Sequence, residues 1–271
     1  MKFADLHIHS YFSDGCFSVQ DILKMAKEQS LSCIAFTDHD SVGAYLESDG
    51  FKDILGLQII PAVEVTTEYN SKEVHILGYF IDYKDPHFLE KLKYLRKARI
   101  LRIKEMIKKL NSLNIDVSFE ELNYLKEDTS ITRLHLAELL LKKGFVQSIL
   151  EAFIKYLGEN ASCYVAGFHF SPSEAIKLIQ DAKGIPVLAH PYNVDNLELL
   201  LLDLINYGIK GIEVYYPQHS PQQVGFYEQL AQKYGLLLTG GSDFHGNQYS
   251  PIKIGSVRIP YDLVEKLKEG L

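Results

Sequence analysis

The sequence contains few of the features that mark secreted or membrane proteins. Its three cysteines, Cys16, Cys33 and Cys163, lie far apart and form no CxxC pair. This argues against a disulfide framework and against zinc bound by thiolates. The N-terminus reaches charged residues at once, at Lys2 and Asp5, so it has no apolar signal segment, and no run approaches the roughly 18 apolar residues of a membrane span. We therefore expect a cytoplasmic protein that makes no membrane contact.

A large excess of positive charge is also absent. The 271 residues include 28 Lys and Arg and 35 Asp and Glu, a formal charge of −7, so the whole chain is not a general polyanion binder. Hydrophobic residues make up 46% and charged residues 23%, as in ordinary globular proteins. The length predicts one large domain, or one domain with a sizeable insertion.

Short runs rich in Val, Ile and Leu alternate with helical patterns over much of the chain. This alternation is typical of βα units around a mostly parallel sheet. Ser18 and Ser171 each stand where a helix N-cap is expected. The expected strands are residues 2–8, 33–37, 58–65, 73–80, 186–189, 211–215, 236–239 and 253–259.

The alternation stops between about residues 85 and 164, where no convincing strand pattern is present. From residue 88, apolar positions such as Leu92, Leu95, Ile103 and Ile107 recur at helical spacing. Two further helices are expected at 132–143 and 149–157. We predict an α/β barrel domain made of residues 1–84 and 165–271, with an all-helical insertion domain at 85–164.

Histidines and acidic residues gather at the ends of the predicted strands. His7 and His9 are two residues apart in one strand, so the pleat directs both side chains to the same face. The carboxyl ends of strands in such folds meet on one side of the molecule. Other candidates at strand ends are Asp38, His39, Asp40, Glu64, His75, His190, Asp243 and His245.

This convergence predicts a metal site with more than one ion. Any one of these histidines alone would be better explained as a structural residue. Together with several acids they need cations, because unpaired buried carboxylates are costly. Imidazoles and carboxylates without thiolates suit Zn, Mn or Fe, and two such ions about 3.5 to 4 Å apart can activate a hydroxide and hold a phosphate.

These motifs resemble the PHP family, named for polymerase and histidinol phosphatase, whose members are metal-dependent phosphoesterases on a distorted (β/α)7 barrel. The resemblance covers both parts of the predicted barrel, in the family's order. It rests on Asp5-Leu6-His7-Ile8-His9-Ser10, Ser13-Asp14-Gly15, Thr37-Asp38-His39-Asp40, Glu64, His75, His190-Pro191 and Ser242-Asp243-Phe244-His245.

The resemblance implies two or three divalent transition-metal ions. It places the first ion on His7, His9, Glu64 and Asp243, the second on Glu64, His75 and His190, and the third on Asp14, His39 and His245. Asp5, Asp38 and Asp40 are then expected to orient the ligands or to transfer protons, with Asp40 as the catalytic candidate.

The insertion is similar to that of the PHP branch that removes phosphate from nucleotides and acts as a 5′ to 3′ exoribonuclease on short RNA. The similarity lies in Thr132-Arg133-Leu134-His135-Leu136-Ala137, Lys143-Gly144-Phe145-Val146 and Lys155-Tyr156-Leu157-Gly158. It implies a substrate that is a 5′-mononucleotide, a 3′,5′-bisphosphate or a short 5′-phosphorylated RNA.

Charge in the insertion also favours a phosphate ligand. Residues 90–109 contain nine Lys or Arg against two Glu, a local charge of +7. The alternative is an exposed basic helix face without a partner.

Individual side chains are also candidates for substrate binding. Arg133 can form a bidentate contact with a phosphate, and the competing view is an arginine that only ends a helix. His219 follows a strand end and could touch the substrate or protonate a leaving oxygen. The substrate-binding candidates are Arg99, Arg102, Arg133, His135 and His219, and Arg133 and His219 are also catalytic candidates.

Two other functions remain open. A histidinol-phosphate phosphatase would share the barrel chemistry, but Arg133 and the basic helix count against it. A metal-binding module without catalysis belongs to another class, and the retention of every expected ligand argues against it. The sequence points to no obligate protein partner.

Overall fold

The computed structural model describes residues 1–49, 51, 56–70, 72–122, 125, 128–167, 170–194, 196–246 and 251–270. Within them, eight strands form one sheet in the order β7-β6-β5-β4-β3-β2-β1-β8. The strands are β1 (Phe3–Ile8), β2 (Cys33–Phe36), β3 (Gln58–Tyr69), β4 (Lys72–Tyr79), β5 (Ile185–Leu188), β6 (Gly211–Tyr215), β7 (Leu237–Gly240) and β8 (Ile259–Pro260).

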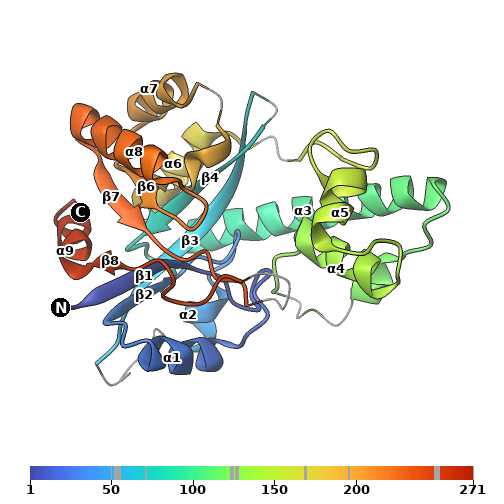
Figure 1. The fold of residues 1–271 in the computed structure, drawn as a ribbon, viewed down its shortest axis with the longest axis horizontal. Coiled ribbons are helices and arrows are strands. Elements are labelled where there is room, and N and C mark those ends of the chain that lie inside the picture. Colours follow the sequence, from blue (N-terminus) through green and yellow to red (C-terminus); the bar gives the residue numbers. More distant parts are fainter. Residues whose placement is uncertain are drawn as a thin grey trace.

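The sheet curls into a nearly closed barrel (Figure 1). The last residue of β1, Ile8, forms a parallel bridge with Phe244, which follows β7. The backbone N–H of His9 also donates to the carbonyl of Phe244, at 2.9 Å. This junction brings the segment after β7 beside the end of β1, and so brings its acidic and histidine residues to the barrel mouth. The predicted distorted barrel is confirmed.

The distortion comes mainly from β4. The pairs β1–β2, β2–β3, β5–β6 and β6–β7 are parallel, as expected, but β4 runs antiparallel to both β3 and β5. β3 and β4 form a hairpin, so no helix separates them. The expected strand at 253–259 is largely wrong, because β8 begins at Ile259. Before it, the N–H of Gly255 donates to Asp5 Oδ2 at 2.8 Å, so this segment bonds to a side chain instead of a neighbouring strand.

Helices cover the outside of the barrel, as Figure 1 shows. Ser18 caps the first of them and Ser171 caps another through a reciprocal capping box with Glu174, so both predicted N-caps are confirmed. Apolar side chains of the helices and strands, among them Ile22 and Ile179, form the main core. These helices are α1 (Val19–Glu28), α2 (Gly43–Glu47), α6 (Pro172–Asp181), α7 (Leu197–Tyr207), α8 (Pro221–Tyr234) and α9 (Tyr261–Glu269), with a short 3-10 turn at Pro191–Asn193.

The remaining helices project from one side of the barrel (Figure 1). They are α3 (Pro86–Ser112), a 3-10 turn at Phe119–Leu122, α4 (Arg133–Lys142) and α5 (Ile149–Ala152), which continues as a π-helical turn at Phe153–Leu157. Their far parts share a hydrophobic core of their own, which includes Leu110 and Leu136. The first turns of α3, at Phe88 and Leu92, instead pack in the barrel core. Because α3 belongs to both cores, the boundaries at 85 and 164 stay a prediction.

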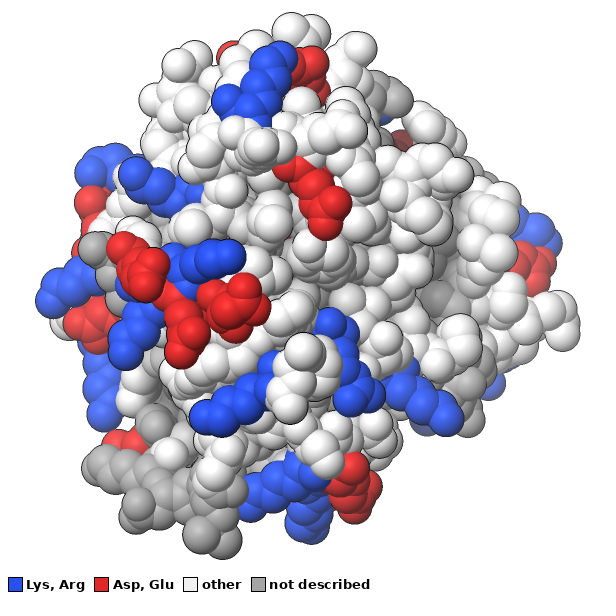
Figure 2. Space-filling model, turned by 60° about the vertical axis from the view of Figure 1, so that its left-hand side comes forward, with Lys and Arg blue, Asp and Glu red and all other residues white. Residues whose placement is uncertain are grey.

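On the face shown in Figure 2, charged side chains lie in small groups. Acidic and basic ones gather together at the left, and the basic ones across the lower half are separated by uncharged residues. Among the described residues, none of the helices combines the length and apolar character that a membrane crossing requires.

Candidate metal centre

The structure brings together all nine side chains expected as metal ligands. His7, Glu64 and His75 lie within strands, and the other six follow strand ends. Together they form four overlapping groups, and within each group the possible ligand atoms lie within 4.8 Å of one another. The groups are His9, Asp14, His39 and His245; His7, Glu64 and His190; His7, His9 and Asp243; and His39, Glu64 and His75.

Glu64 lies at the centre of the cluster. Its Oε1 atom is 2.9 Å from both His75 Nδ1 and His190 Nε2. Its Oε2 atom is 3.0 Å from His39 Nδ1 and 3.3 Å from His9 Nε2. One carboxylate therefore faces imidazoles from several strands, which is the arrangement a carboxylate bridging two ions would have.

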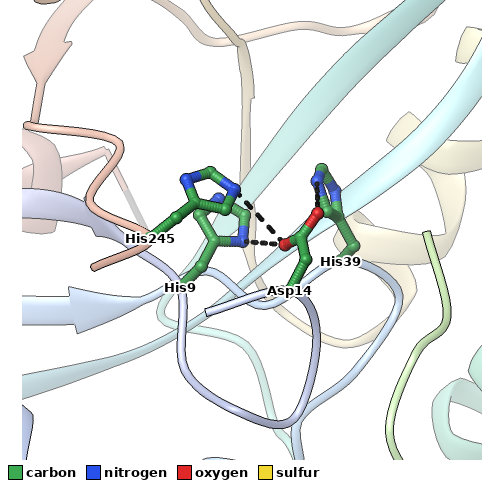
Figure 3. Close-up of side chains that lie close together, drawn as sticks. All are labelled: His9, Asp14, His39 and His245. Atoms are coloured by element: carbon green, nitrogen blue, oxygen red, sulfur yellow. Dashed lines mark ion pairs between the residues drawn. The ribbon is translucent and has the colours of Figure 1, made fainter. Parts of the chain in front are cut away.

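Asp14 and Asp243 lie on either side of the His9 imidazole. In Figure 3, the Asp14 carboxylate points between His39 on one side and His9 and His245 on the other. Asp14 Oδ1 is 3.6 Å from His9 Nδ1 and 3.3 Å from His245 Nε2, and its Oδ2 is 3.7 Å from His39 Nε2. Asp243 Oδ1 is 3.1 Å from His9 Nε2. The two carboxylates thus mark two sides of an extended site.

Several atoms of this cluster are buried and have no hydrogen-bond partner among the described residues, although oppositely charged groups lie close to them. His39 Nδ1 and Glu64 Oε2 are 3.0 Å apart, yet their geometry makes no hydrogen bond. Lone pairs that converge on a shared point are what metal coordination requires, whereas buried polar atoms otherwise find partners. The atoms of the cluster without partners are His7 Nε2, His9 Nε2, Asp14 Oδ1, His39 Nδ1 and Glu64 Oε2. The residues present therefore fit divalent cations.

The charges within the cluster favour the ionised carboxylates, which are the forms that bind a metal ion. Burial alone would raise the pKa of Glu64, but His39, His75 and His7 lower it well below its usual value. Burial lowers the pKa of His9 to about 3, and His245 adds to this effect. Burial opposes protonation of His75 as well, yet Glu64 and Glu73 raise its pKa to about 10. A proton on such a histidine blocks the lone pair that a metal ion would bind. Metal binding is therefore expected to release these protons.

Two further carboxylates hold the ligands, and the sequence did not identify either. Glu213, on β6, is fully buried. Its Oε1 atom is 2.9 Å from His7 Nδ1, and its Oε2 atom accepts the backbone N–H of His190 at 2.9 Å. A carboxylate on the second nitrogen of an imidazole fixes the orientation of the ring and makes it a better ligand. The only signal was one acid in the otherwise apolar Gly211–Tyr215 strand.

Glu73 connects the candidate metal ligands to the insertion. Its Oε1 atom is 3.1 Å from His75 Nε2 and 3.0 Å from Arg133 Nη2, and its Oε2 atom is 3.0 Å from Arg102 Nη1. The ionised form of Glu73 is favoured because the pull of Arg133 and His75 outweighs burial and lowers its pKa well below the usual value. Its position at the start of β4 gave no sign of this role.

The three aspartates of the strand-end motifs that were not assigned to an ion hold the backbone and neighbouring side chains in place. Asp5 accepts from the backbone N–H and hydroxyl of Ser242, at 2.8 and 2.6 Å. Asp38 accepts from the Ser13 hydroxyl at 2.7 Å. Asp40 Oδ2 is 2.6 Å from Arg99 Nε. Both Asp40 and Arg99 are therefore engaged with each other inside the structure.

The other substrate-binding candidates differ in whether they can reach the groove. His135 Nδ1 accepts the backbone N–H of Thr132 at 3.0 Å, so it takes part in the N-terminal cap of α4. His219 is buried, and its Nδ1 donates to the carbonyl of Val214 at 2.7 Å. The His219 ring lies 5.1 Å from that of Tyr216, which in turn lies 5.3 Å from that of His190. Of the predicted substrate contacts, Arg133 is the one that lines the groove beside the ligands, among the described residues.

That groove has a volume of about 460 Å³ and opens next to His75 and His190. Arg133 and Glu73 form one wall. The size is within the range of small-molecule sites. A phosphate ester placed here would meet both the ligand cluster and a guanidinium.

Comparisons with known proteins agree with this geometry. The family model described as PHP domain matches residues 5–185. A 3′,5′-nucleoside bisphosphate phosphatase of Chromobacterium violaceum is 32% identical over 246 residues, which are 89% of this chain and 86% of that protein. The 5′-3′ exoribonuclease Rnm of Escherichia coli K12 is 31% identical over 89% of this chain and 84% of its own length. The crystal structure of a protein described as a metal-dependent phosphoesterase from Bifidobacterium adolescentis superposes with a TM-score of 0.88 at 27% identity, over 97% of this chain and 94% of that one.

Proposed function

The chain belongs to the PHP family and is a metal-dependent hydrolase of phosphoric esters, and from this premise we propose that its substrates are nucleotides. The substrates are 5′-mononucleotides or nucleoside 3′,5′-bisphosphates, and short RNAs trimmed from a phosphorylated 5′ end. The observation that carries the proposal is Arg133, which lines the groove beside His75 and His190. Relatives named as a nucleoside bisphosphate phosphatase and an exoribonuclease support it.

We propose two or three ions of Mn, Fe or Zn in the cluster. His7, His9, Glu64 and Asp243 would hold one, Glu64 with His75 and His190 another, and Asp14, His39 and His245 a third. Such ions supply positive charge for the phosphate oxygens and lower the pKa of an attacking water molecule.

The residues of the chain then have separate tasks. Arg133 binds a phosphate oxygen of the substrate, since a guanidinium can make two parallel hydrogen bonds to it. Glu73 keeps the Arg133 side chain directed along the groove wall, at 3.0 Å. His219 is the candidate that protonates the leaving oxygen; because its Nδ1–H donates to Val214, its Nε2 would first have to take up a proton. Asp40 positions Arg99, with which it forms an ion pair of 2.6 Å.

A cytoplasmic location and activity without an obligate protein partner are part of the proposal. Cys16, Cys33 and Cys163 are all free thiols, which fits a reducing compartment.

A substrate screen with metal analysis tests the proposal. Protein purified without chelator and loaded with Mn is expected to contain two or three ions per chain. It should hydrolyse nucleoside 3′,5′-bisphosphates, mononucleotides or short 5′-phosphorylated RNA at a higher kcat/KM than histidinol phosphate. A preference for histidinol phosphate would establish the alternative phosphatase. Full metal loading without hydrolysis of any of these esters would establish a metal-binding module without catalysis.

A further inference from the structure

Asp243 lies beyond the end of β7, on a segment whose backbone leaves the extended conformation. Its φ of 51° falls in the left-handed region, which aspartate adopts more readily than most residues. The other carboxylate proposed for the first ion, Glu64, lies inside β3, where strand pairing holds the backbone. The direction of the Asp243 side chain therefore depends on the groups that its carboxylate contacts.

The two oxygen atoms of the Asp243 carboxylate face different groups. Oδ1 lies 3.3 Å from His7 Nε2 and 3.1 Å from His9 Nε2, among the candidate ligands. Oδ2 accepts a hydrogen bond of 2.8 Å from the hydroxyl of Tyr216. The hydroxyl is the donor, because an ionised carboxylate can only accept. This bond occupies Oδ2 and leaves Oδ1 directed at the two imidazoles.

Packing holds the Tyr216 side chain in place. The residue directly follows β6 and is buried. Its ring stacks on that of Tyr192, with centroids 5.6 Å apart and planes 15° apart. It also lies 5.3 Å from the His190 ring and 5.1 Å from the His219 ring. Because three rings surround the tyrosine, its hydroxyl has a fixed position from which it can orient the carboxylate.

We propose that Tyr216 is a positioning residue of the metal centre, and that its hydroxyl directs Asp243 Oδ1 to the ion shared with His7 and His9. The inference rests on the ligand set proposed above for the first ion, and it adds to that set a residue that does not touch the ion. A group that hydrogen-bonds to a ligand orients it and typically contributes about 10- to 100-fold to metal affinity. The other two proposed sites do not include Asp243, so the effect should be confined to one ion.

Tyr216→Phe tests this role because it removes the hydroxyl and keeps the ring that packs on Tyr192. Tyr215→Phe is the matched control. The Tyr215 hydroxyl also donates to a carboxylate at 2.8 Å, but this carboxylate is Glu228 on α8, outside the ligand cluster. Each substitution therefore removes one hydrogen bond between a tyrosine and a carboxylate, one at the candidate ligand Asp243 and the other elsewhere.

Metal affinity is the first measurement. Chelator-treated protein is titrated with Mn²⁺ by isothermal titration calorimetry. Tyr216→Phe should bind one ion about 10- to 100-fold more weakly than the wild-type protein, and the remaining ions with unchanged Kd. Tyr215→Phe should match the wild-type protein at every ion. Circular dichroism of each metal-free variant establishes whether the chain is folded.

Two further readouts separate positioning from a purely structural or a catalytic role. The visible absorption of bound Co²⁺ depends on the coordination of the ion, so the spectrum of the Co²⁺-loaded protein should change in Tyr216→Phe and stay the same in Tyr215→Phe. Hydrolysis of adenosine 3′,5′-bisphosphate by Tyr216→Phe should be slower than wild type at limiting Mn²⁺. It should recover at saturating Mn²⁺, with unchanged KM.

The outcomes distinguish the role of Tyr216 from the metal centre on which it acts. Unchanged Kd for every ion in Tyr216→Phe, or an equal loss in Tyr215→Phe, would overturn the positioning role alone. A Tyr216→Phe chain that does not fold, or that loses affinity equally for all ions, would mean that the hydroxyl supports the barrel, and would also overturn that role. A wild-type protein that binds no Mn²⁺ would overturn the proposed metal centre itself.

Discussion

Arg133 lies where a side chain can serve the fold, the substrate or both. It is the first residue of α4, its Nη2 atom is 3.0 Å from Glu73 Oε1, and its guanidinium lies 5.7 Å from the centre of the Tyr164 ring. The side chain nevertheless stays 17% exposed and lines the groove. Glu73 also binds Arg102, so it keeps a cationic partner if Arg133 is removed. Loss of Arg133 therefore does not leave a buried charge alone.

We predict that Arg133→Ala keeps its fold and metal content but lowers kcat/KM for nucleotides by about one to two orders of magnitude. This corresponds to about 1.5 to 3 kcal/mol for a charge-assisted contact. A small chromogenic phosphate ester that does not reach the insertion should be affected much less. Lys97→Ala removes one exposed positive charge from α3 and is the matched control. Equal losses on both substrates would place Arg133 at the reacting phosphate, and no loss on either would remove it from substrate recognition.

The candidate ligands and the carboxylates that hold them differ in how well the sequence identifies them. His7, His9 and His190 follow runs that read clearly as strands, so their convergence follows from the fold class. Glu73 and Glu213 lie inside or at the start of strands, where an acid usually faces water. Only the folded barrel reveals that Glu213 points inward to His7, at 2.9 Å. The clustering of the candidate ligands was predictable, and the carboxylates that hold them were not.

Among the elements, α6 shows how local sequence and packing cooperate. Ser171 accepts the N–H of Glu174, and Glu174 in turn accepts the N–H of Ser171 at 2.7 Å. The helix packs closely on β4, since a Cβ at Gly78 would lie 2.9 Å from the Ile179 side chain. The cap fixes the start of the helix, and the close contact fixes its position on the barrel.

Ser171→Ala should lower the free energy of unfolding by about 1 kcal/mol, the usual cost of losing an N-cap. The activity of the metal-loaded enzyme should not change, because Ser171 is outside the groove. Urea denaturation with saturating metal measures the effect. Ser112→Ala, which removes a hydroxyl from the exposed end of α3, is the control and should change stability by less than about 0.5 kcal/mol. Equal effects of the two substitutions would show that the cap adds nothing.

Strand pairing was the part of the fold that the sequence predicted least well. The runs at 58–65 and 73–80 have the composition of strands whether they pair parallel or antiparallel, so composition alone did not indicate the β3–β4 hairpin. The segment before Ile259 was predicted as a strand because of its apolar residues. Its actual partner is Asp5, a contact between residues 250 positions apart that no local pattern contains.

At the scale of the whole molecule, some charged side chains are buried in ion pairs and others lie exposed on the surface. Two arginines of the basic run on α3 are buried in ion pairs, Arg99 with Asp40 and Arg102 with Glu73. Lysines of the same run, such as Lys97, are exposed. The local positive charge seen in the sequence is therefore partly neutralised within the fold. The barrel mouth instead gathers buried carboxylates, whose mutual repulsion the surrounding imidazoles reduce.

This arrangement predicts that cations stabilise the entire fold. An ion that binds only the folded chain adds RT ln(1 + [ion]/Kd), which is about 2.7 kcal/mol at a hundredfold excess over Kd. For a protein of this size, such a gain raises Tm by roughly 5 to 10 °C. Thermal unfolding with increasing Mn²⁺, after treatment with chelator, should show Tm rising with concentration. Glu64→Gln keeps the side-chain volume but removes the charge that faces His39, His75 and His190, so it should lose most of this rise. A Tm that is independent of Mn²⁺ in the wild-type protein would contradict a metal centre in this cluster, whereas an equal rise in Glu64→Gln would show that the ions bind without the carboxylate proposed to bridge them.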